Sequence, residues 1–519
     1  MRRRLLLVAG VFAGAGILAA AGTAAARAAW PLPQVADAGG SLVRVSLSGL
    51  GGRLQSVRVL DPKADEVPVR VADGDVWPLR KLRQGERLVV QVTVRRPGWA
   101  GWLVGETATR TFVVTTPRVG VRDRILHVPH GGSVAVRLAG GADVVSVDGV
   151  VRHGIGRVVP IRTTAPAGSV EIAAAARTWE TLSDPVRVSW FPVGADRALV
   201  TSPAPGASLG PLQRVTLSFS SPIPHPLPAL HASAAGRWTV VDDHSVAFEP
   251  TAAGYPLGGS LRVVLPKELR AVVPSTGRIA GRLSWPVAAG KTLRLQQLLA
   301  QLGYLPLRWN ATGPMPARTP AAQVQAAVTP PAGTFTWRWA HVPAALRALW
   351  KPGTATLTRG ALMRFEDAHG LPVSATPDPA VWRALFADVA AGRLNTAGYT
   401  YVLVHETVPQ ALQLWHNGKL VLRTPGNTGI FAAPTEQGTF AVFEHIPVGT
   451  MSGTNPDGSH YNDPGVRWIS YFNGGDAIHA FYRPSYGTPQ SLGCVELPYT
   501  AAEQVWPYTP VGTIVTVAQ

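Results

Sequence analysis

Hydrophobic and polar residues alternate in short runs along most of the first 290 residues. The clearest runs hold six or seven residues each: Leu88–Val94, Ser133–Leu138, Arg214–Phe219 and Ser260–Leu265. Alternation with a period of two predicts strands that bury one face, and clusters of glycine and proline between the runs predict turns. Because a β-sandwich usually takes about 100 residues, we expect three sandwiches here, at 30–116, 117–195 and 196–290.

The hydrophobic period lengthens to about 3.6 residues after Lys291, which predicts a helix. Leucines recur at spacings of three and four residues, and Gly303 follows as a stop signal. A second helix is expected with Thr358 as its N-cap and Gly370 at its end. A third begins with Asp378 as N-cap and a proline at the first helical position. These segments predict a small three-helix domain over 291–390, interrupted by a proline- and alanine-rich insert at 305–357.

Alternating runs return at Tyr399 and continue to the end of the sequence. They are Tyr401–Val404, Ala411–Trp415, Lys419–Arg423, Gly438–Phe443 and Gly512–Val517. His416-Asn417-Gly418 has the composition of a tight hairpin turn. We therefore expect a mostly β domain over residues 395–519, and a multidomain, mainly β chain as a whole.

The N-terminal segment has the pattern of an export signal. Three arginines, Arg2–Arg4, precede a run of 22 residues, Leu5–Ala26, that contains no charge, and small residues near Ala26 suit a signal peptidase. A run of this length also suffices to span a bilayer. Residues 1–29 are therefore expected to be a signal peptide or a membrane anchor, which leaves the rest of the chain outside the cytoplasm, in the cell wall or extracellular.

The charge of the chain changes the picture of its partners. The 519 residues carry a formal charge of +17, which predicts an anionic partner such as nucleic acid, a membrane surface or an acidic polymer. An arginine excess that merely reflects composition is the alternative, since only six of the 48 basic residues are lysine. Export and the lack of a nucleic-acid motif disfavour nucleic acid. Residues 395–519 hold four basic and eight acidic residues, a net of −4, so residues 1–394 carry +21. An anionic wall polymer or membrane surface is thus the expected partner of the N-terminal part.

The chain has a single cysteine, Cys494, which excludes a disulfide within the chain and a four-thiolate zinc site. His479 lies fifteen residues earlier, at the end of an apolar run. An imidazole beside a thiol makes a nucleophile, and Gly493 would let backbone N–H groups face a developing oxyanion. From these residues alone, an inert buried cysteine and a structural histidine remain the alternative. No metal ligands or cofactor motif are expected, and His405, His445 and His460 are scattered without metal-ligand spacing.

The motif around Cys494 resembles the active site of the YkuD-type L,D-transpeptidases. That family carries a histidine, a gap of a dozen or so residues and then Ser/Thr-His-Gly-Cys. His479 matches the first histidine, and Ser491, Gly493 and Cys494 match the second block. Val511-Gly512-Thr513 matches the closing strand of the family. The resemblance covers the whole region 395–519.

This resemblance implies a peptidoglycan enzyme without cofactor. Cys494 is the implied nucleophile and His479 the general base, oriented by the backbone carbonyl of Ala480. Gly493 supplies oxyanion-hole backbone and Ser491 supports the site. A thioester formed from a tetrapeptide stem is then attacked by the amine of a second stem, which gives a 3→3 crosslink. Two alternatives are an L,D-carboxypeptidase, with water as acceptor, and a non-catalytic wall-binding protein.

Two departures from the family pattern bear on the activity. Leu492 stands where the family usually has histidine: activity survives if that position contributes only backbone and shape, and the rate falls if the family's histidine ring helps catalysis. Glu496 replaces a more usual Asn or Arg, and its carboxylate would disfavour the thiolate unless Arg483 or Arg467 pairs with it. The residues expected to contact substrate share the segment around the motif: Trp468, Tyr471, Asn473, Arg483 and Glu496.

Two upstream regions also resemble modules of cell-wall proteins. Residues 202–269 resemble bacterial Ig-like modules. Leu295–Tyr304 and Thr358–Leu385 resemble the three-helix peptidoglycan-binding domain, although the insert departs from that pattern. A helical linker that binds nothing is the alternative for this region.

Overall fold

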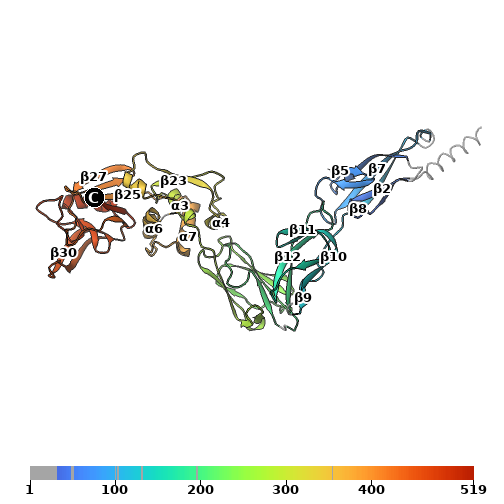
Figure 1. Ribbon diagram of the computed structural model, residues 1–519, viewed down its shortest axis with the longest axis horizontal. Helices are drawn as coiled ribbons and strands as arrows, with labels where there is room; N and C mark the ends of the chain where they lie inside the picture. Colours follow the sequence, from blue (N-terminus) through green and yellow to red (C-terminus); the bar gives the residue numbers. More distant parts are fainter. Residues whose placement is uncertain are drawn as a thin grey trace, which may run out of the picture. The chain divides into compact units, whose positions relative to one another are not determined.

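The computed structural model describes residues 32–47, 52–99, 101, 105–129, 133–194, 197–353 and 355–519 (Figure 1). The expected export segment, 1–29, lies outside the described residues. Among the described helices, none combines the length and the apolar character needed to cross a membrane. The chain divides into two compact units. The first holds the described residues up to Thr201 together with Ser218–Ile223 and Ala271–Ile279, and the second holds the rest. Strands hold far more of the described residues than helices do, so the chain is a mainly β multidomain protein.

The first unit begins with two four-stranded sheets around one core. The sheet orders are β1-β2-β6-β5 and β4-β3-β7-β8. Valines of alternating position on β7 are fully buried, as the run at Leu88–Val94 predicts. The strands are β1 Gln34–Ala36, β2 Val43–Ser46, β3 Arg53–Leu60, β4 Glu66–Val67, β5 Val69–Ala72, β6 Asp75–Pro78, β7 Arg87–Arg95 and β8 Thr107–Thr115.

The next region, where a sandwich is expected at 117–195, also consists of strands. Its strands form one five-stranded sheet, β11-β10-β12-β13-β9. The register of β10 against β11 shifts between Arg137 and Val144, and such bulges bend a strand and increase its twist. Val136 and Val145, from the two halves of β10, join the same buried cluster, so the bent sheet encloses its own core. The strands are β9 Ile125–Val128, β10 Val134–Val147, β11 Val150–Ile161, β12 Gly168–Ala175 and β13 Val186–Pro192.

The residues of the third expected sandwich, 196–290, are divided between the two units. Within the second unit β17 and β18 pair antiparallel, and β16, β19 and β22 form a three-stranded sheet. The elements of this region are β14 Leu199–Ser202, β15 Val215–Phe219, β16 His231–Ala232, β17 Gly236–Asp242, β18 Ser245–Pro250, β19 Ser260–Val264, η1 Lys267–Leu269, β20 Ala271–Val273, β21 Arg278–Ala280 and β22 Arg282–Pro286.

Three helices follow where the period of 3.6 predicts them. The first, α3 (Thr292–Leu302), ends at Gly303 with φ of 90°, a conformation that glycine adopts without steric cost. The last, α7 (Pro379–Ala391), begins as expected: the Asp378 carboxylate accepts hydrogen bonds from two backbone N–H groups of the first turn. The helix α6 (Thr356–Ala368) starts two residues before the expected N-cap. Thr358 lies inside it, where its hydroxyl accepts a hydrogen bond from Gln296.

The insert at 305–357 is an ordered part of the helical domain. It contains the hairpin of β23 (Leu307–Ala311) and β24 (Gly333–Trp337) and two short helices, α4 (Pro320–Val328) and α5 (Ala344–Ala348). Its apolar residues join the core that α3, α6 and α7 form. The insert therefore enlarges the domain.

The C-terminal domain has two sheets, with orders β27-β26-β25-β33-β28 and β29-β30-β31-β32. Asn417 and Gly418, both with positive φ, turn β26 into β27 as the sequence predicts. Apolar residues of both sheets and of α8 form one buried cluster. The elements are β25 Thr400–His405, β26 Ala411–His416, β27 Lys419–Pro425, β28 Gly438–Ala441, β29 Glu444–Thr454, β30 His460–Asn473, β31 Asp476–Ala480, β32 Val495–Leu497, α8 Tyr499–Val505, η2 Trp506–Tyr508 and β33 Ile514–Ala518.

The helical domain and the C-terminal domain share a core within the second unit. Tyr401, Leu403 and Ile514 belong to the same buried cluster as the leucines of α3 and α6. The two domains approach closely at Gly360 on α6, where an added Cβ would lie 2.6 Å from the carbonyl oxygen of Gly512. Figure 1 shows α3, α6 and α7 beside β25.

Candidate active site

The candidate site is built on two neighbouring parallel strands, β31 and β32. Ile478 lies opposite Val495, and His479 lies opposite Glu496. Ile478 and Val495 point into the main core of the domain. Since side chains alternate along a strand, His479 and Glu496 point to the opposite face. Cys494, directly before β32, packs on that face too, in a smaller cluster with Ala477.

Cys494 is half-buried, and its thiol sits against the turn that precedes β31. Its Sγ lies 3.6 Å from the carbonyl oxygen of Gly475. Burial raises the pKa of the thiol to about 12, with the carboxylates of Asp476 and Glu496 adding to the rise and the backbone N–H of Ala477 opposing it. The resting cysteine is therefore a neutral thiol at neutral pH, and it needs a base to become a nucleophile.

His479 is buried and has a fixed orientation. Its Nδ1 lies 3.0 Å from the carbonyl oxygen of Ala480, which places the proton of the neutral ring on Nδ1 and leaves Nε2 as the basic nitrogen. Burial lowers the pKa of the imidazole, while the Ala480 carbonyl and Glu496 act in the opposite direction. His479 is thus a neutral base at neutral pH.

Ser491 and Gly493 shape the loop that carries the cysteine. The buried Ser491 hydroxyl donates a hydrogen bond of 2.5 Å to the carbonyl oxygen of Cys494. An isolated parallel β-bridge joins the backbone of Ser491 to that of Gly429. This bridge anchors the loop that carries Cys494 to the segment after β27. Gly493 has φ of 112°, which favours glycine because other residues would be strained there. Leu492, where the family usually has histidine, is half-buried between these two residues.

Of the two candidate partners for Glu496, the structure brings Arg483 to it. The guanidinium donates two hydrogen bonds to the carboxylate, Nε to Oε2 at 2.8 Å and Nη2 to Oε1 at 2.7 Å. Arg483 also lies over the ring of Phe481, 4.7 Å from its centroid. Arg467 is instead exposed on β30, opposite Val448. Because the Glu496 carboxylate is paired with a cation, its charge disfavours the thiolate much less than an unpaired carboxylate would.

The residues expected to contact substrate separate into two groups. Tyr471 joins the cluster that contains Cys494, and Asn473 donates a hydrogen bond of 3.2 Å to Asp476. Trp468 instead packs against the main core and edge-on to Tyr499. Its positive φ of 56° interrupts the regular strand geometry of β30.

Asp476 is a site residue that the sequence analysis missed. It begins β31, and an ideal Cβ on Gly493 would lie 2.4 Å from its Oδ1. A lone aspartate three residues before the histidine matches no motif. The sequence does place Asp476 directly after the Gly474-Gly475 turn. Only the register of β31 against β32 shows that this position lies beside Cys494.

The remaining histidines of this domain have structural surroundings. His445 stacks on Trp506 with ring centroids 4.2 Å apart and lies 3.1 Å from the Ser470 hydroxyl. His460 contacts the Thr454 hydroxyl on the exposed hairpin of β29 and β30. Within the described ranges, no three His, Cys, Asp or Glu side chains are grouped so that they could hold a metal ion.

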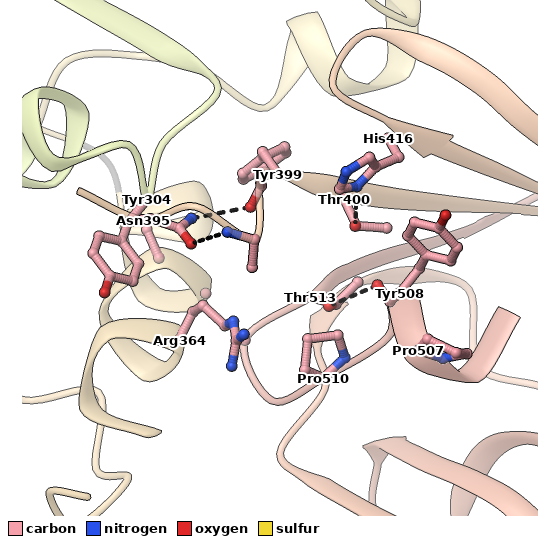
Figure 2. Close-up of a pocket in the computed structure, with 15 residues that line it drawn as sticks. Tyr304, Arg364, Asn395, Tyr399, Thr400, His416, Pro507, Tyr508, Pro510 and Thr513 are labelled. Atoms are coloured by element: carbon pink, nitrogen blue, oxygen red, sulfur yellow. Dashed lines mark hydrogen bonds between the residues drawn. The ribbon is translucent and has the colours of Figure 1, made fainter. Parts of the chain in front are cut away.

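A separate pocket of about 490 Å³ lies between the helical domain and the C-terminal domain (Figure 2). Figure 2 shows Arg364 of α6 and Tyr508 at its wall, with Thr400 hydrogen-bonded to His416. None of its lining residues belongs to the Cys494 site. This pocket marks the joint between the two domains rather than the catalytic cleft.

The C-terminal domain also matches a known family. Residues 399–517 match the YkuD model, described as the L,D-transpeptidase catalytic domain. No curated protein matches the chain.

Among solved structures, the catalytic domain of an E. faecium L,D-transpeptidase is 28% identical over 23% of this chain and 96% of that one, with a TM-score of 0.22. An L,D-transpeptidase from Mycobacterium smegmatis is 13% identical, covering 62% of this chain and 100% of that one, with a TM-score of 0.21. L,D-transpeptidase 3 from Mycobacterium tuberculosis is 11% identical, covering 62% and 97%, with a TM-score of 0.22. These scores are low, and the assignment rests on the family model. Residues 399–517 of this chain are therefore an L,D-transpeptidase catalytic domain of the YkuD family.

Proposed function

We propose that this protein forms 3→3 crosslinks between peptidoglycan stem peptides through a thioester on Cys494. The observation that supports this best is the parallel register of β31 and β32, which puts Cys494 and His479 on one face of the sheet. Cys494 lies two residues before Glu496, the strand partner of His479. With a strand spacing of about 4.8 Å and a rise of about 3.3 Å per residue, this offset puts the Cα atoms of Cys494 and His479 about 8 Å apart. Side chains of this size reach one another across that distance.

In the first half-reaction the thiol and the imidazole act as a neutral pair. The thiol proton passes to Nε2 of His479 as Sγ attacks the carbonyl carbon of the third stem residue. The imidazolium then returns that proton to the terminal D-Ala amine as the C–N bond breaks, which leaves a thioester. The Ala480 carbonyl keeps Nε2 directed at the reaction by holding the Nδ1 proton.

The backbone around Gly493 is the proposed oxyanion hole. A tetrahedral intermediate places negative charge on the former carbonyl oxygen, and backbone N–H groups in a site shielded from water stabilise such charge strongly. The Ser491 hydroxyl, which binds the carbonyl of Cys494, fixes the orientation of this peptide segment. Leu492 then contributes shape and backbone, and no step needs an imidazole at that position.

Two other candidate functions lead to different outcomes. An L,D-carboxypeptidase would use the same thioester with water as acceptor. A degenerate, non-catalytic site would follow if Glu496 kept an unpaired charge beside the thiol. The bidentate pairing with Arg483 argues against the degenerate site.

The test is acylation by a carbapenem, a β-lactam whose ring a nucleophilic thiol opens. We expect intact-protein mass spectrometry to find one adduct on the full chain, located at Cys494, and incubation with a tetrapeptide donor and an amine acceptor to give the coupled product. Cys494→Ala should lose both, and His479→Gln should slow acylation by at least about a hundredfold, as is typical for loss of a general base. A folded wild-type chain without an adduct contradicts the enzyme assignment. Coupling that survives in Cys494→Ala contradicts the choice of nucleophile.

We also propose that the chain works outside the cytoplasm, at the cell wall, with the helical domain and the basic N-terminal part contributing to attachment. The export pattern of the sequence and the location of peptidoglycan support this proposal. Fractionation of cells that express the full chain tests it. Recovery in the cytoplasmic fraction would overturn it.

A further inference from the structure

A carboxylate without a role in the chemistry above flanks the reacting sulfur. Asp476 is half-buried, and its Oδ1 would lie 2.4 Å from a Cβ on Gly493, the residue directly before Cys494. The thiol of Cys494 contacts the carbonyl oxygen of Gly475, the residue directly before Asp476. The Asp476 carboxylate is therefore within reach of a group that approaches the thioester carbon.

The charge of this carboxylate has no cation beside it. Oδ2 accepts hydrogen bonds from Asn473 Nδ2 at 3.2 Å and from the backbone N–H of Glu436 at 3.4 Å, both neutral donors. Among the described residues, no arginine, lysine or histidine contributes to its electrostatic surroundings, and Glu436 adds a second negative charge. Glu496 differs, because Arg483 neutralises it. Asp476 thus carries the charge that a cationic ligand would complement.

A groove open to solvent, with about 920 Å³ of empty space, has the hydrogen-bond partner of this carboxylate in its wall. Its walls are residues of α6, β28 and β33, and it includes Asn473 and Gly474 of the turn between β30 and β31. Asn473 lines the groove and donates to Asp476. The exposed Arg359 of α6 lines the same groove. The groove therefore has a guanidinium in its wall and is joined, through Asn473, to an uncompensated carboxylate beside the nucleophile.

We infer that Asp476 binds the ammonium group of the acceptor, and that the acceptor is a peptide whose carboxylate lies at Arg359 in this groove. The inference rests on the proposed function, which requires an amine acceptor, and adds where that amine binds. A carboxylate retains an ammonium by a charge-assisted hydrogen bond and gives water no such advantage. Asp476 would in this way favour transfer over hydrolysis.

Transfer to the acceptor forms an amide and releases the thiol. The ammonium gives one proton to bulk water by way of the Asp476 carboxylate and becomes a neutral amine. Its nitrogen attacks the thioester carbon, so that a C–N bond forms and the C–S bond breaks. The second proton leaves the nitrogen for Nε2 of His479 and passes to the departing Sγ. The products are an amide, the free thiol and one proton in solution.

The test is the variant Asp476→Asn in the full chain, which removes the charge and keeps the shape. The rate of coupling is measured as the acceptor amine is varied, together with the ratio of coupled to hydrolysed donor. Since a hydrogen bond to a charged group contributes roughly 1.5–3 kcal/mol, a rise in the acceptor KM of at least about tenfold is expected, with a similar fall in the ratio. Acylation of Cys494 by a carbapenem should be unchanged or faster. Glu503→Gln on the exposed face of α8 is the matched control for net charge and should change neither quantity.

A second variant tests the groove. Arg359→Gln should raise the KM of an acceptor with a free carboxylate several-fold and leave the KM of the same acceptor as its amide unchanged. An acceptor KM in Asp476→Asn within twofold of wild type overturns the inference. Equal losses of acylation and coupling also overturn it, because they indicate a structural role. A wild-type chain that couples its donor normally while Asp476→Asn does so with an unchanged acceptor KM overturns the acceptor site alone. A wild-type chain that is acylated but only hydrolyses its donor, or that forms no carbapenem adduct, overturns the proposed function itself.

Discussion

At the scale of single residues, the charges around Cys494 decide whether the site works. Burial keeps the thiol protonated and the imidazole neutral, and these two directions suit a proton transfer that accompanies attack. A further unpaired negative charge would hold the thiol in its protonated form more firmly. Arg483 prevents this at Glu496, whereas Asp476 keeps its charge beside the sulfur.

The ion pair between Arg483 and Glu496 gives a prediction at this scale. Arg483→Met leaves Glu496, whose side chain is 5% exposed, charged and unpaired. We expect the free energy of unfolding to fall by about 2–3 kcal/mol, slightly below the range for fully buried pairs because the arginine is 30% exposed. Acylation of Cys494 by a carbapenem should slow about tenfold for each unit by which the pKa of the thiol rises. Thermal unfolding and stopped-flow acylation measure the two effects.

The double variant Arg483→Met/Glu496→Gln is the control for this pair. It removes both charges and should recover most of the lost stability and acylation rate. If the double variant is as slow as Arg483→Met alone, the arginine acts by contacting substrate and not by neutralising Glu496.

The sequence could reveal some of these residues and not others. Cys494 and His479 were predictable because they match a spaced motif, and Ser491 and Gly493 belong to the same block. Arg483 could be named only as one of two partners for Glu496, since contacts thirteen residues apart depend on how the loop folds. Asp476 was missed because a lone carboxylate has no periodicity and its role depends on the register of two strands.

At the scale of elements, the helices show what local sequence can determine. The ends of α3 and α7 follow from Gly303 and Asp378, whose conformations and capping bonds are local properties. The start of α6 was misplaced because Ala355 offers no capping side chain. Alternation predicts the strands of the second region but not how they pair, so the bend that the bulge in β10 gives its sheet could not be predicted.

The contact of α6 with the turn before β33 gives the prediction at this scale. Gly360→Ala would place a Cβ 2.6 Å from the Gly512 carbonyl oxygen and 2.6 Å from Ile514 Cδ1, closer than packed atoms tolerate. Although alanine favours helices, overpacking typically costs 1–3 kcal/mol, so a net loss of stability is expected. Hydrogen exchange should increase in both α6 and β33. Gly313→Ala is the control, because the added Cβ meets nothing within 4 Å; hydrogen exchange in α6 and β33 should stay unchanged. Equal effects of the two variants would mean that α6 does not depend on its contact with Gly512.

At the scale of the whole molecule, charge and chemistry are in different parts of the chain. Residues 395–519 have a net charge of −4, and residues 1–394 have +21. A negatively charged catalytic domain suits an amine acceptor, whereas a strongly basic partner region suits an anionic wall polymer. The shared core of the helical and catalytic domains could not be predicted, because hydrophobic periodicity shows that a helix face is buried but not what buries it.

This division of charge predicts that binding of the protein to cell wall depends on salt. We expect the full chain as Cys494→Ala, which cannot become covalently bound, to sediment with purified sacculi at low ionic strength. Release should increase as salt is raised from about 0.05 to 0.5 M, because exposed charges are screened over a Debye length of about 10 Å at 0.1 M. Sacculi stripped of anionic polymers are the control, and they should retain much less protein. Retention that is the same at all salt concentrations and on stripped sacculi would contradict this prediction. It would mean that an uncharged surface binds the wall, and the helical domain would be the first region to test.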